Sequence, residues 1–247
     1  MTNLFISGIT GRMGKELANR ALNDKEFKIV GGSCSANGNF VNKEIGTLLG
    51  VQGLDIKISS TIPKRHSIDV VVDFSLPEVS IATVKEASKQ NLPCIIGTTG
   101  FSKKQITEFK LLSTKIPILL SSNTSIGISL MKKMILSIVN DLGALNEIVI
   151  KETHHINKVD SPSGTAINLK DFLSKNVNSL SEVQVVSSRY GEEIGEHTIS
   201  FIKDSESIHI THKALNRNIF ADGALICASW IKDKKPGLYS MGDISSF

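Results

Sequence analysis

Aromatic side chains are scarce in this chain of 247 residues: Phe, Trp and Tyr together make up 5% of it, with one Trp and two Tyr. Proteins that bind nucleic acid usually stack bases on such rings and gather lysine and arginine on one face. Here the formal net charge is only +4, and the basic residues are scattered along the chain. We therefore expect no nucleic-acid partner, although the positive balance favours anionic small molecules.

Cysteine is also rare. Cys34, Cys94 and Cys227 are the three in the chain, and their wide spacing follows no pattern. An odd number of cysteines at such spacing argues against a disulfide framework and against a zinc knuckle. We expect three free thiols in a reducing compartment, which points to the cytoplasm.

Long apolar runs are missing as well. No stretch approaches the roughly 20 residues that a membrane-spanning helix needs, and the first residues show no pattern of a signal peptide. We expect no membrane partner. Since 40% of the residues are apolar, the chain is long enough to build two modest domains, each with its own core.

In the first half of the chain, short β-rich runs alternate with helical patterns. Pro77 suits the first turn of one helix, and Ser102 suits the cap of another. Strands that recur with crossover helices predict an α/β fold with a Rossmann-like, doubly wound parallel sheet. The predicted strands cover residues 4–7, 27–31, 68–74, 93–96 and 116–120.

The pattern changes near residue 126 to one typical of an α+β domain with a mixed or antiparallel sheet, open on one face. A last helix at 218–231 and the tail around Pro236 indicate no sheet of their own, so we expect them to pack on the first domain. The predicted domains are therefore 1–125 with 218–247, for a dinucleotide, and 126–217, for a substrate. The second contains predicted helices from 126 to about 142 and around 166–173, and strands at 147–153, 183–188, 197–203 and 207–213.

A glycine-rich turn, Gly8-Ile-Thr-Gly-Arg-Met-Gly14, follows the first predicted strand. Such a turn lets the backbone approach a pyrophosphate at a helix N-terminus, but Thr10 stands where the dinucleotide fingerprint has its middle glycine. A tight turn without a ligand is the alternative. The loops at 97–100 and 121–124 follow later strands and should lie along the same sheet edge, which favours a nucleotide site.

The second predicted strand runs into Gly31-Gly-Ser-Cys-Ser35 and offers no carboxylate for the ribose hydroxyl of NAD. The lack of a carboxylate removes repulsion toward a 2′-phosphate, and Arg12 or Lys43 could contact one. NADPH is thus permitted, and the choice between NADH and NADPH stays open.

Residues 152–165 concentrate polar chemistry directly after an apolar strand: two imidazoles, an ammonium group and a hydroxyl-rich helix start. Imidazoles titrate near neutral pH, and the N–H groups of Ser163, Gly164 and Thr165 could bind an anion at the helix N-terminus. Surface histidines, a solvated lysine and a plain helix cap are the alternatives. Adjacent ligands on an extended chain point to opposite faces, and no Cys or His follows at a supporting spacing, so we expect no metal.

These motifs, together with Gly195-Glu-His-Thr198 and Thr211-His-Lys-Ala214, resemble the 4-hydroxy-tetrahydrodipicolinate reductase family, also called dihydrodipicolinate reductases, over essentially the whole chain. The resemblance implies reduction of a cyclic dicarboxylate with NADH or NADPH in the diaminopimelate branch of lysine synthesis. It also implies a homotetramer assembled through the sheet of the 126–217 domain, which would then serve both substrate binding and oligomerisation.

The resemblance further implies roles for individual residues. His154 matches the proton donor and Lys158 the second catalytic cation. Contacts to the substrate fall on His155, Gly164 and Thr165, and Ser163 joins them as the start of the helix. The residues implied to bind the cofactor are Gly8, Ile9, Thr10, Gly11, Arg12, Met13, Gly97, Thr98, Thr99, Ser121, Ser122, Asn123 and Thr124.

Two positions depart from the family pattern. Cys34 and Ser35 stand where the family often has an acidic residue followed by Arg, which leaves the cofactor preference open. Ser122-Asn123-Thr124 replaces a common Ala-Asn followed by an aromatic residue, so packing near the nicotinamide should differ.

The mechanism expected from both readings begins with closure of the two domains. Hydride then goes to the ring carbon conjugated to the imine, and His154 protonates the enamine-like carbanion. One rival is an aspartate- or homoserine-type dehydrogenase, which would need another base or a reactive cysteine. The other is a non-catalytic NADPH-binding regulator, which gives no reason for His154 and Lys158.

Overall fold

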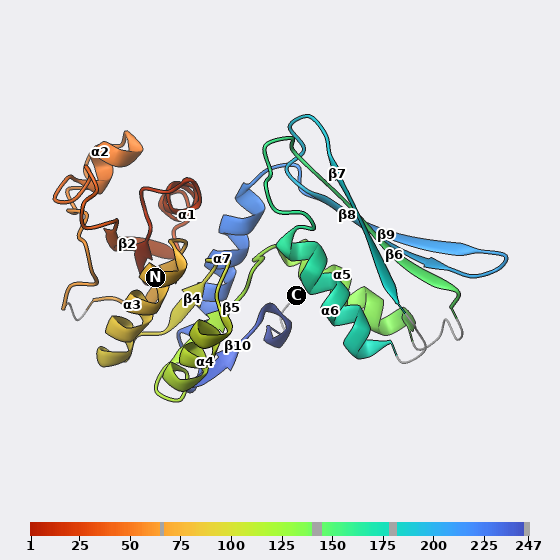
Figure 1. Cartoon of the computed structure of the whole chain (residues 1–247). Coiled ribbons are helices and arrows are strands. Elements are labelled where there is room, and N and C mark those ends of the chain that lie inside the picture. Colours follow the sequence, from red (N-terminus) through yellow and green to blue (C-terminus); the bar gives the residue numbers. More distant parts are fainter. Residues whose placement is uncertain (65–66, 140–144, 178–181, 245–247) are drawn as a thin grey trace. The chain divides into compact units, whose positions relative to one another are not determined.

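The computed structural model describes residues 1–64, 67–139, 145–177 and 182–244 (Figure 1). The chain forms two compact units. The first consists of Met1–Thr124 and Phe220–Phe247, and the second consists of Ser125–Ile219.

The first unit contains a six-stranded parallel sheet, which confirms the predicted fold. Strand order is β10-β5-β4-β3-β1-β2, so the direction in which strands are added reverses beside β1. Ligands of open α/β sheets bind at such a switch point, at the carboxyl ends of the strands. The strands are β1 (Thr2–Ser7), β2 (Phe27–Ser33), β3 (Val70–Asp73), β4 (Cys94–Ile96), β5 (Pro117–Leu120) and β10 (Gly237–Tyr239).

The tail adds an edge strand to this sheet, which the sequence did not indicate. Gly237 to Tyr239 pair in parallel with residues 117–119 of β5. Three residues after a proline are too few to show the alternating pattern that identifies a strand. The tail nevertheless lies with the first unit.

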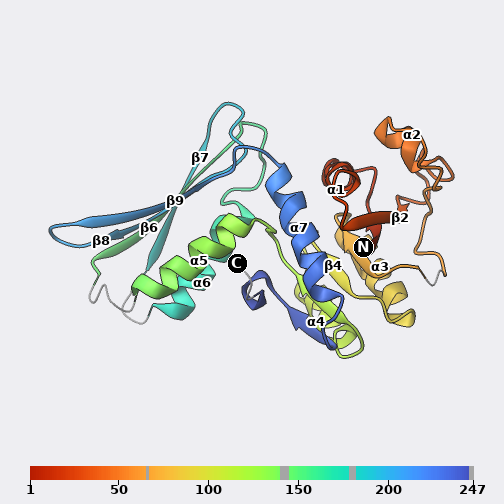
Figure 2. The same ribbon diagram turned by 180° about the vertical axis from the view of Figure 1, so that it is seen from behind.

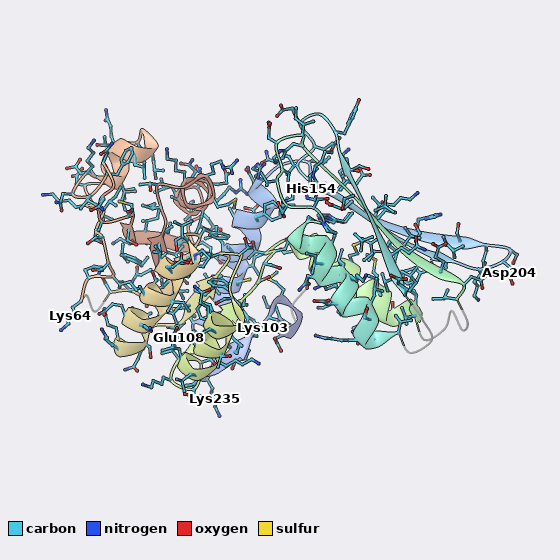
Figure 3. All side chains as sticks on the ribbon, viewed as in Figure 1. Lys64, Lys103, Glu108, His154, Asp204 and Lys235 are labelled. Atoms are coloured by element: carbon cyan, nitrogen blue, oxygen red, sulfur yellow. The ribbon has the colours of Figure 1, made fainter. Side chains whose placement is uncertain are left out.

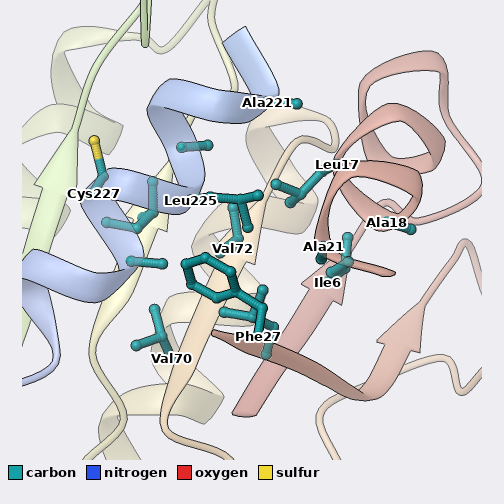
Figure 4. Packing of buried hydrophobic residues seen from close by; sticks show 14 of the residues in the cluster. Ile6, Leu17, Ala18, Ala21, Phe27, Val70, Val72, Ala221, Leu225 and Cys227 are labelled. Atoms are coloured by element: carbon teal, nitrogen blue, oxygen red, sulfur yellow. The ribbon is translucent and has the colours of Figure 1, made fainter. Parts of the chain in front are cut away.

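Helices cover both faces of the parallel sheet because successive strand side chains point to opposite faces. Leu4 and Ile6 belong to a core with α1 and α7, whereas Phe5 belongs to a core with α3 and α4. Figure 4 shows side chains of α1 and α7 packed against Val70 and Val72 of β3. The helices are α1 (Arg12–Leu22), α2 (Ile45–Leu49), α3 (Pro77–Lys89), α4 (Lys103–Leu112), α7 (Asn218–Ile231) and the short 3-10 helix η1 (Met241–Asp243).

Two predicted helix starts are confirmed. Pro77 is in the first turn of α3, where its missing N–H removes no helical bond. Ser102 caps α4, and Gln105 returns the interaction to form a capping box.

The second unit contains a mixed four-stranded sheet of order β7-β6-β8-β9, as predicted. β6 pairs in parallel with β7, and the other pairs are antiparallel. In Figures 1 and 2, α5 and α6 lie along one face of this sheet. The elements are α5 (Ile126–Val139), β6 (Glu147–His154), α6 (Gly164–Asn176), β7 (Val183–Arg189), β8 (Glu196–Ile202) and β9 (Ser207–Lys213).

The end of the predicted helix near residue 142 lies outside the described residues. Over the four described ranges, no helix combines the length and apolar character required to cross a membrane.

Candidate active site

The glycine turn after β1 has the geometry of a phosphate-binding turn. Gly8 has a φ of 75°, and a Cβ added to it would lie 2.5 Å from the Phe74 carbonyl oxygen. Gly11 is the N-cap of α1, and because it has no side chain it cannot accept a hydrogen bond from the N–H groups of the first helical turn. Helix N–H groups left in this way favour an anion. The turn therefore fits the pyrophosphate of a dinucleotide.

Gly14 is in the first turn of α1, and its lack of a side chain lets the helix pack against the glycine turn. A Cβ at Gly14 would lie 2.2 Å from the Gly8 carbonyl oxygen and 2.7 Å from the Ile9 Cα, so backbone would have to move. We expect Gly14→Ala to lower the free energy of unfolding by about 3 kcal/mol, in the range of core overpacking, and to weaken dinucleotide binding. Thermal unfolding and a fluorescence titration with NADPH measure both effects.

Gly242→Ala is the matched control for this prediction, because the nearest atom to its added Cβ is 3.5 Å away. Equal stability and equal dinucleotide affinity for the two variants would contradict the role given to Gly14.

The loop after β4 is fixed by a buried carboxylate that sequence reasoning missed. Asp73 ends β3 and is fully buried. It accepts hydrogen bonds from Thr98 Oγ1 at 2.7 Å and Ser75 Oγ at 2.9 Å, and also binds Ser80. Thr98 is itself buried and its hydroxyl accepts the Ser75 N–H at 2.8 Å. Of the predicted cofactor contacts in this loop, Thr98 thus has its hydroxyl committed to the loop itself, whereas Thr99 is exposed.

The loop after β5 is held by its own hydroxyls. Ser121 Oγ donates to the Asn123 carbonyl at 2.6 Å, and Ser122 is exposed. Thr124 is buried and donates to the Phe220 carbonyl at 2.7 Å, so its side chain anchors α7. Thr124 was predicted to contact the cofactor, and its hydroxyl is committed to this structural bond.

All three thiols are free and buried. Burial raises the pKa of Cys34 and Cys94, and raises the pKa of Cys227 to about 12. A cysteine must ionise to act as a nucleophile. The rival that requires a reactive cysteine therefore finds no support in these positions.

In the second unit, the predicted proton donor is the last residue of β6. The His154 side chain is 8% exposed, and its Nδ1 lies in close contact with the Glu152 carboxylate (Figure 3 labels His154). A Cβ at Gly195 would lie 3.0 Å from Nε2, so glycine there keeps a side chain away from that nitrogen. His155 follows the strand, is half-buried, and its carbonyl accepts the Lys158 N–H. The two histidines therefore have different environments.

Several charges set the proton affinity of His154. Burial lowers its pKa below the ordinary value, the charge of Glu152 acts in the opposite direction, and Lys158 and Arg189 lower the pKa further. His197 packs edge-on against the ring with centroids 5.1 Å apart. Burial, with the charge of His154, lowers the pKa of His197 to about 4, so His197 is neutral at pH 7.

Lys158 lies in the loop that follows, and its side chain is 23% exposed. Its Nζ donates to the Asp160 carboxylate at 2.7 Å. Partial burial would raise the pKa of Asp160, but the hydrogen bond and charge of Lys158 outweigh it, and the Gly164 N–H adds to the lowering. Asp160 was not predicted as a site residue, because nothing in the sequence shows that the loop brings its carboxylate to Lys158 Nζ and the Gly164 N–H.

At the start of α6, some of the backbone N–H groups already bond to side chains of the protein. Ser163 is buried, and its Oγ caps α6 by accepting the Ala166 N–H. The same Oγ lies 3.3 Å from His197 Nε2. The expectation of a free Ser163 N–H is wrong, because that group donates to Glu152 Oε1 at 3.2 Å. Gly164 is exposed and Thr165 is half-buried in the first turn, so these two predicted contacts remain accessible.

Glu152, Arg189, Gly195 and His197 complete the site and were missed as functional residues. Glu152 was detectable, since residues two apart on a strand share a face and His154 had been identified. His197 and Gly195 belong to a quoted motif, but only the strand register brings them beside His154. Nothing in the sequence singled out Arg189.

Two neighbours of His154 in the fold, Glu152 and His197, bear on the expectation of no metal. Glu152, His154 and His197 each place a possible ligand atom within 4.8 Å of the others. However, Arg189 Nη1 binds the same carboxylate at 3.1 Å, and its fixed positive charge would repel a divalent cation. We interpret the cluster as one that handles a proton.

A parallel sheet with a phosphate-binding turn, joined to a unit with a buried imidazole beside a lysine, defines a dinucleotide-dependent oxidoreductase for an anionic substrate. Residues 2–124 match the family described as dihydrodipicolinate reductase, N-terminus, and residues 127–244 match dihydrodipicolinate reductase, C-terminus. The chain belongs to the dihydrodipicolinate reductase family, whose members are oxidoreductases of lysine biosynthesis that use NADH or NADPH.

Relatives match this chain over nearly its full length. The 4-hydroxy-tetrahydrodipicolinate reductase of Buchnera aphidicola subsp. Cinara cedri is 37% identical, covering 98% of this chain and 96% of its own. The enzyme of the same name from Colwellia psychrerythraea is 33% identical, covering 97% and 96%. A dipicolinate-bound dihydrodipicolinate reductase from Paenisporosarcina sp. TG-14 has the same fold, with a TM-score of 0.74, 21% identity and 97% of each chain covered.

Proposed function

We propose that this chain reduces 4-hydroxy-tetrahydrodipicolinate to tetrahydrodipicolinate, with His154 as proton donor and Lys158 as the cation that binds the substrate. The observation that carries the proposal is the buried His154 ring, with Nδ1 against the Glu152 carboxylate and Nε2 beside Gly195, which has no side chain. A general acid must be held with one nitrogen directed to the reacting atom.

Asp160 supports the assignment of the anion-binding groups. Its carboxylate lies on Lys158 Nζ and is stabilised by the Gly164 N–H. Lys158 Nζ and the Gly164 N–H can therefore bind a carboxylate in this geometry. A substrate carboxylate that replaces Asp160 would gain the same charge-assisted hydrogen bonds, and Thr165 and His155 would complete the contacts.

When bound, the nicotinamide supplies the hydride; the residues of the second unit bind, orient and protonate the substrate. Burial lowers the pKa of His154, and this would leave the ring mostly neutral at pH 7. A dicarboxylate brings negative charge, which favours the imidazolium and raises the pKa. Binding of the substrate thus charges the acid that the reaction needs.

For the cofactor, we propose that Gly8 to Met13, Gly97 to Thr99 and Ser121 to Thr124 form the binding loops, and that NADPH is accepted. From Gly31 to Lys43 the sequence has no acidic residue, so nothing there repels a 2′-phosphate. Arg12 belongs to the first of these loops, Lys43 follows the segment after β2, and both side chains are exposed and positively charged.

We also propose a cytoplasmic homotetramer assembled through the outer face of the four-stranded sheet. Lys151, Val186, Thr198 and Thr211 form one registered row on the face opposite α5 and α6. Among the described residues of this unit, no helix covers that face. Light scattering at four times the mass of the chain supports this assembly, and a monomer mass opposes it.

The function is tested by following cofactor oxidation with the proposed substrate, using NADH and NADPH in parallel. We expect turnover with NADPH, and a rise in its KM, but not in that of NADH, when Arg12 and Lys43 are both replaced by Met. Binding of either cofactor without turnover would favour the non-catalytic regulator instead.

A further inference from the structure

The sheet of the second unit changes character along its length, on the face covered by α5 and α6. One registered row, Ile150 with Val185, Ile199 and Ile210, is apolar. Two residues further along the strands, the next row on the same face is Glu152, Ser187, His197 and His212. Burying a row of polar side chains costs free energy unless every group is paired. A row that serves stability alone would be apolar, so we look for a function of these side chains.

Glu152 is the centre of that row. Its side chain is fully buried. Oε1 accepts hydrogen bonds from Arg189 Nη1 at 3.1 Å and from the Ser163 N–H at 3.2 Å, and the other oxygen contacts His154 Nδ1. Burial alone would raise the pKa of Glu152, but the nearby Ser187 hydroxyl, the hydrogen bond from Arg189 and the charge of His154 outweigh it. The carboxylate is therefore ionised at neutral pH.

An ionised carboxylate can only accept hydrogen bonds. A bare His154 Nδ1 would repel the carboxylate at this contact, so the tautomer that suits it has the proton on Nδ1 and leaves Nε2 as the nitrogen that gains and loses a proton. Nε2 is also the atom beside Gly195, where no side chain intervenes. The contact thus fixes both the tautomer and the direction of the ring.

Arg189 extends the arrangement to the lysine loop. Besides Glu152, its guanidinium donates to the Lys158 carbonyl at 3.3 Å and to the Asp160 carbonyl. One side chain on β7 therefore links the carboxylate that holds His154 to the backbone that carries Lys158. The proton donor and the anion-binding cation are held by a common support.

We infer that Glu152, supported by Arg189 and the Ser163 N–H, is the positioning residue that fixes His154 with its Nε2 directed to the substrate. This inference rests on the proposed role of His154. Glu152 itself acts through the histidine, since its carboxylate is fully buried and contacts the ring at Nδ1.

The test is Glu152→Gln, which keeps the shape and removes the charge. The groups around His154 that set its pKa are Glu152, Lys158, Arg189 and the neutral His197. Loss of the one anion lowers the pKa of His154, and a general acid works only while protonated. We expect single-turnover cofactor oxidation to slow about 10-fold, with its alkaline limb moved to lower pH by about one unit.

Controls separate positioning from general damage. Glu147→Gln changes the first residue of the same strand, and we expect a native rate and a native pH profile. The dissociation constant of NADPH should be unchanged in both variants. Glu152→Asp retains the charge, so its alkaline limb should return toward the native position even if the rate stays low.

A second measurement needs no variant. With ¹⁵N-labelled histidine in the native protein, the His154 signals should show a proton held on Nδ1 and titration at Nε2. A neutral ring protonated at Nε2 and bare at Nδ1 would overturn the inference, even if Glu152→Gln failed to fold.

His154→Asn distinguishes this inference from the proposed function. A native rate in that variant would remove the proton donor itself. A slow His154→Asn variant beside a Glu152→Gln variant with native rate and native pH profile would leave the proton donor in place and refute the role of Glu152 alone.

Discussion

Replacing His154 with Asn is expected to lower kcat about 100-fold, which is within the usual contribution of a general acid. Asparagine occupies part of the same space and can still meet Glu152, but it cannot deliver a proton at neutral pH. The dissociation constant of NADPH should stay native, because the histidine lies in the second unit and the proposed dinucleotide loops lie in the first. Steady-state turnover and a separate fluorescence titration measure the two quantities.

The matched control for His154→Asn is His209→Asn. His209 is on β9, and its ring Nδ1 is paired with Ser200 on the opposite face of the same sheet. Because this face is also the one proposed for assembly, light scattering checks the mass of the variant, and at the native mass we expect a native kcat. Equal losses in both variants would indicate a general effect on the sheet rather than loss of an acid.

Replacing Lys158 with Met is expected to raise the KM of the dicarboxylate about 10-fold or more and to lower kcat as well. The change keeps the length of the side chain and removes the charge, so a substrate carboxylate loses a charge-assisted hydrogen bond worth roughly 1.5–3 kcal/mol. Initial rates over a range of substrate concentrations, at saturating cofactor, give both constants.

Asp160→Asn provides the comparison for Lys158. Asp160 holds the Lys158 ammonium group at 2.7 Å, and its removal leaves that charge available to the substrate. We expect a KM at or below the native value. Lys158→Met with unchanged KM and kcat would show that the substrate anion is bound elsewhere.

The fold could be predicted because its signals are local. Short apolar strands, Pro77 and Ser102 each indicate an element or its start within a few residues. The edge strand at 237–239 gave no such signal, since its only reason to be extended is the neighbouring strand β5. Short edge strands depend on tertiary pairing and not on their own composition.

The site could be predicted in part, for the same physical reason. His154 and Lys158 stand four positions apart, so the sequence shows them together. Arg189 and His197 come from other strands, and only the register of β6 with β7 and β8 brings them to His154. The prediction of a free N–H at Ser163 was wrong because the sequence does not reveal that Glu152 accepts a hydrogen bond from it.

The claim at the centre of this account is that a buried imidazole, charged by the arrival of the substrate, delivers the proton. It is tested most directly by measuring kcat and kcat/KM against pH for the native protein and for His154→Asn. Because burial lowers the pKa of His154 in the free protein, and the dicarboxylate raises it in the complex, the native alkaline limb of kcat should lie at higher pH than that of kcat/KM. Both limbs should vanish in the variant, and a variant that keeps the native rate and the native limbs would contradict the account.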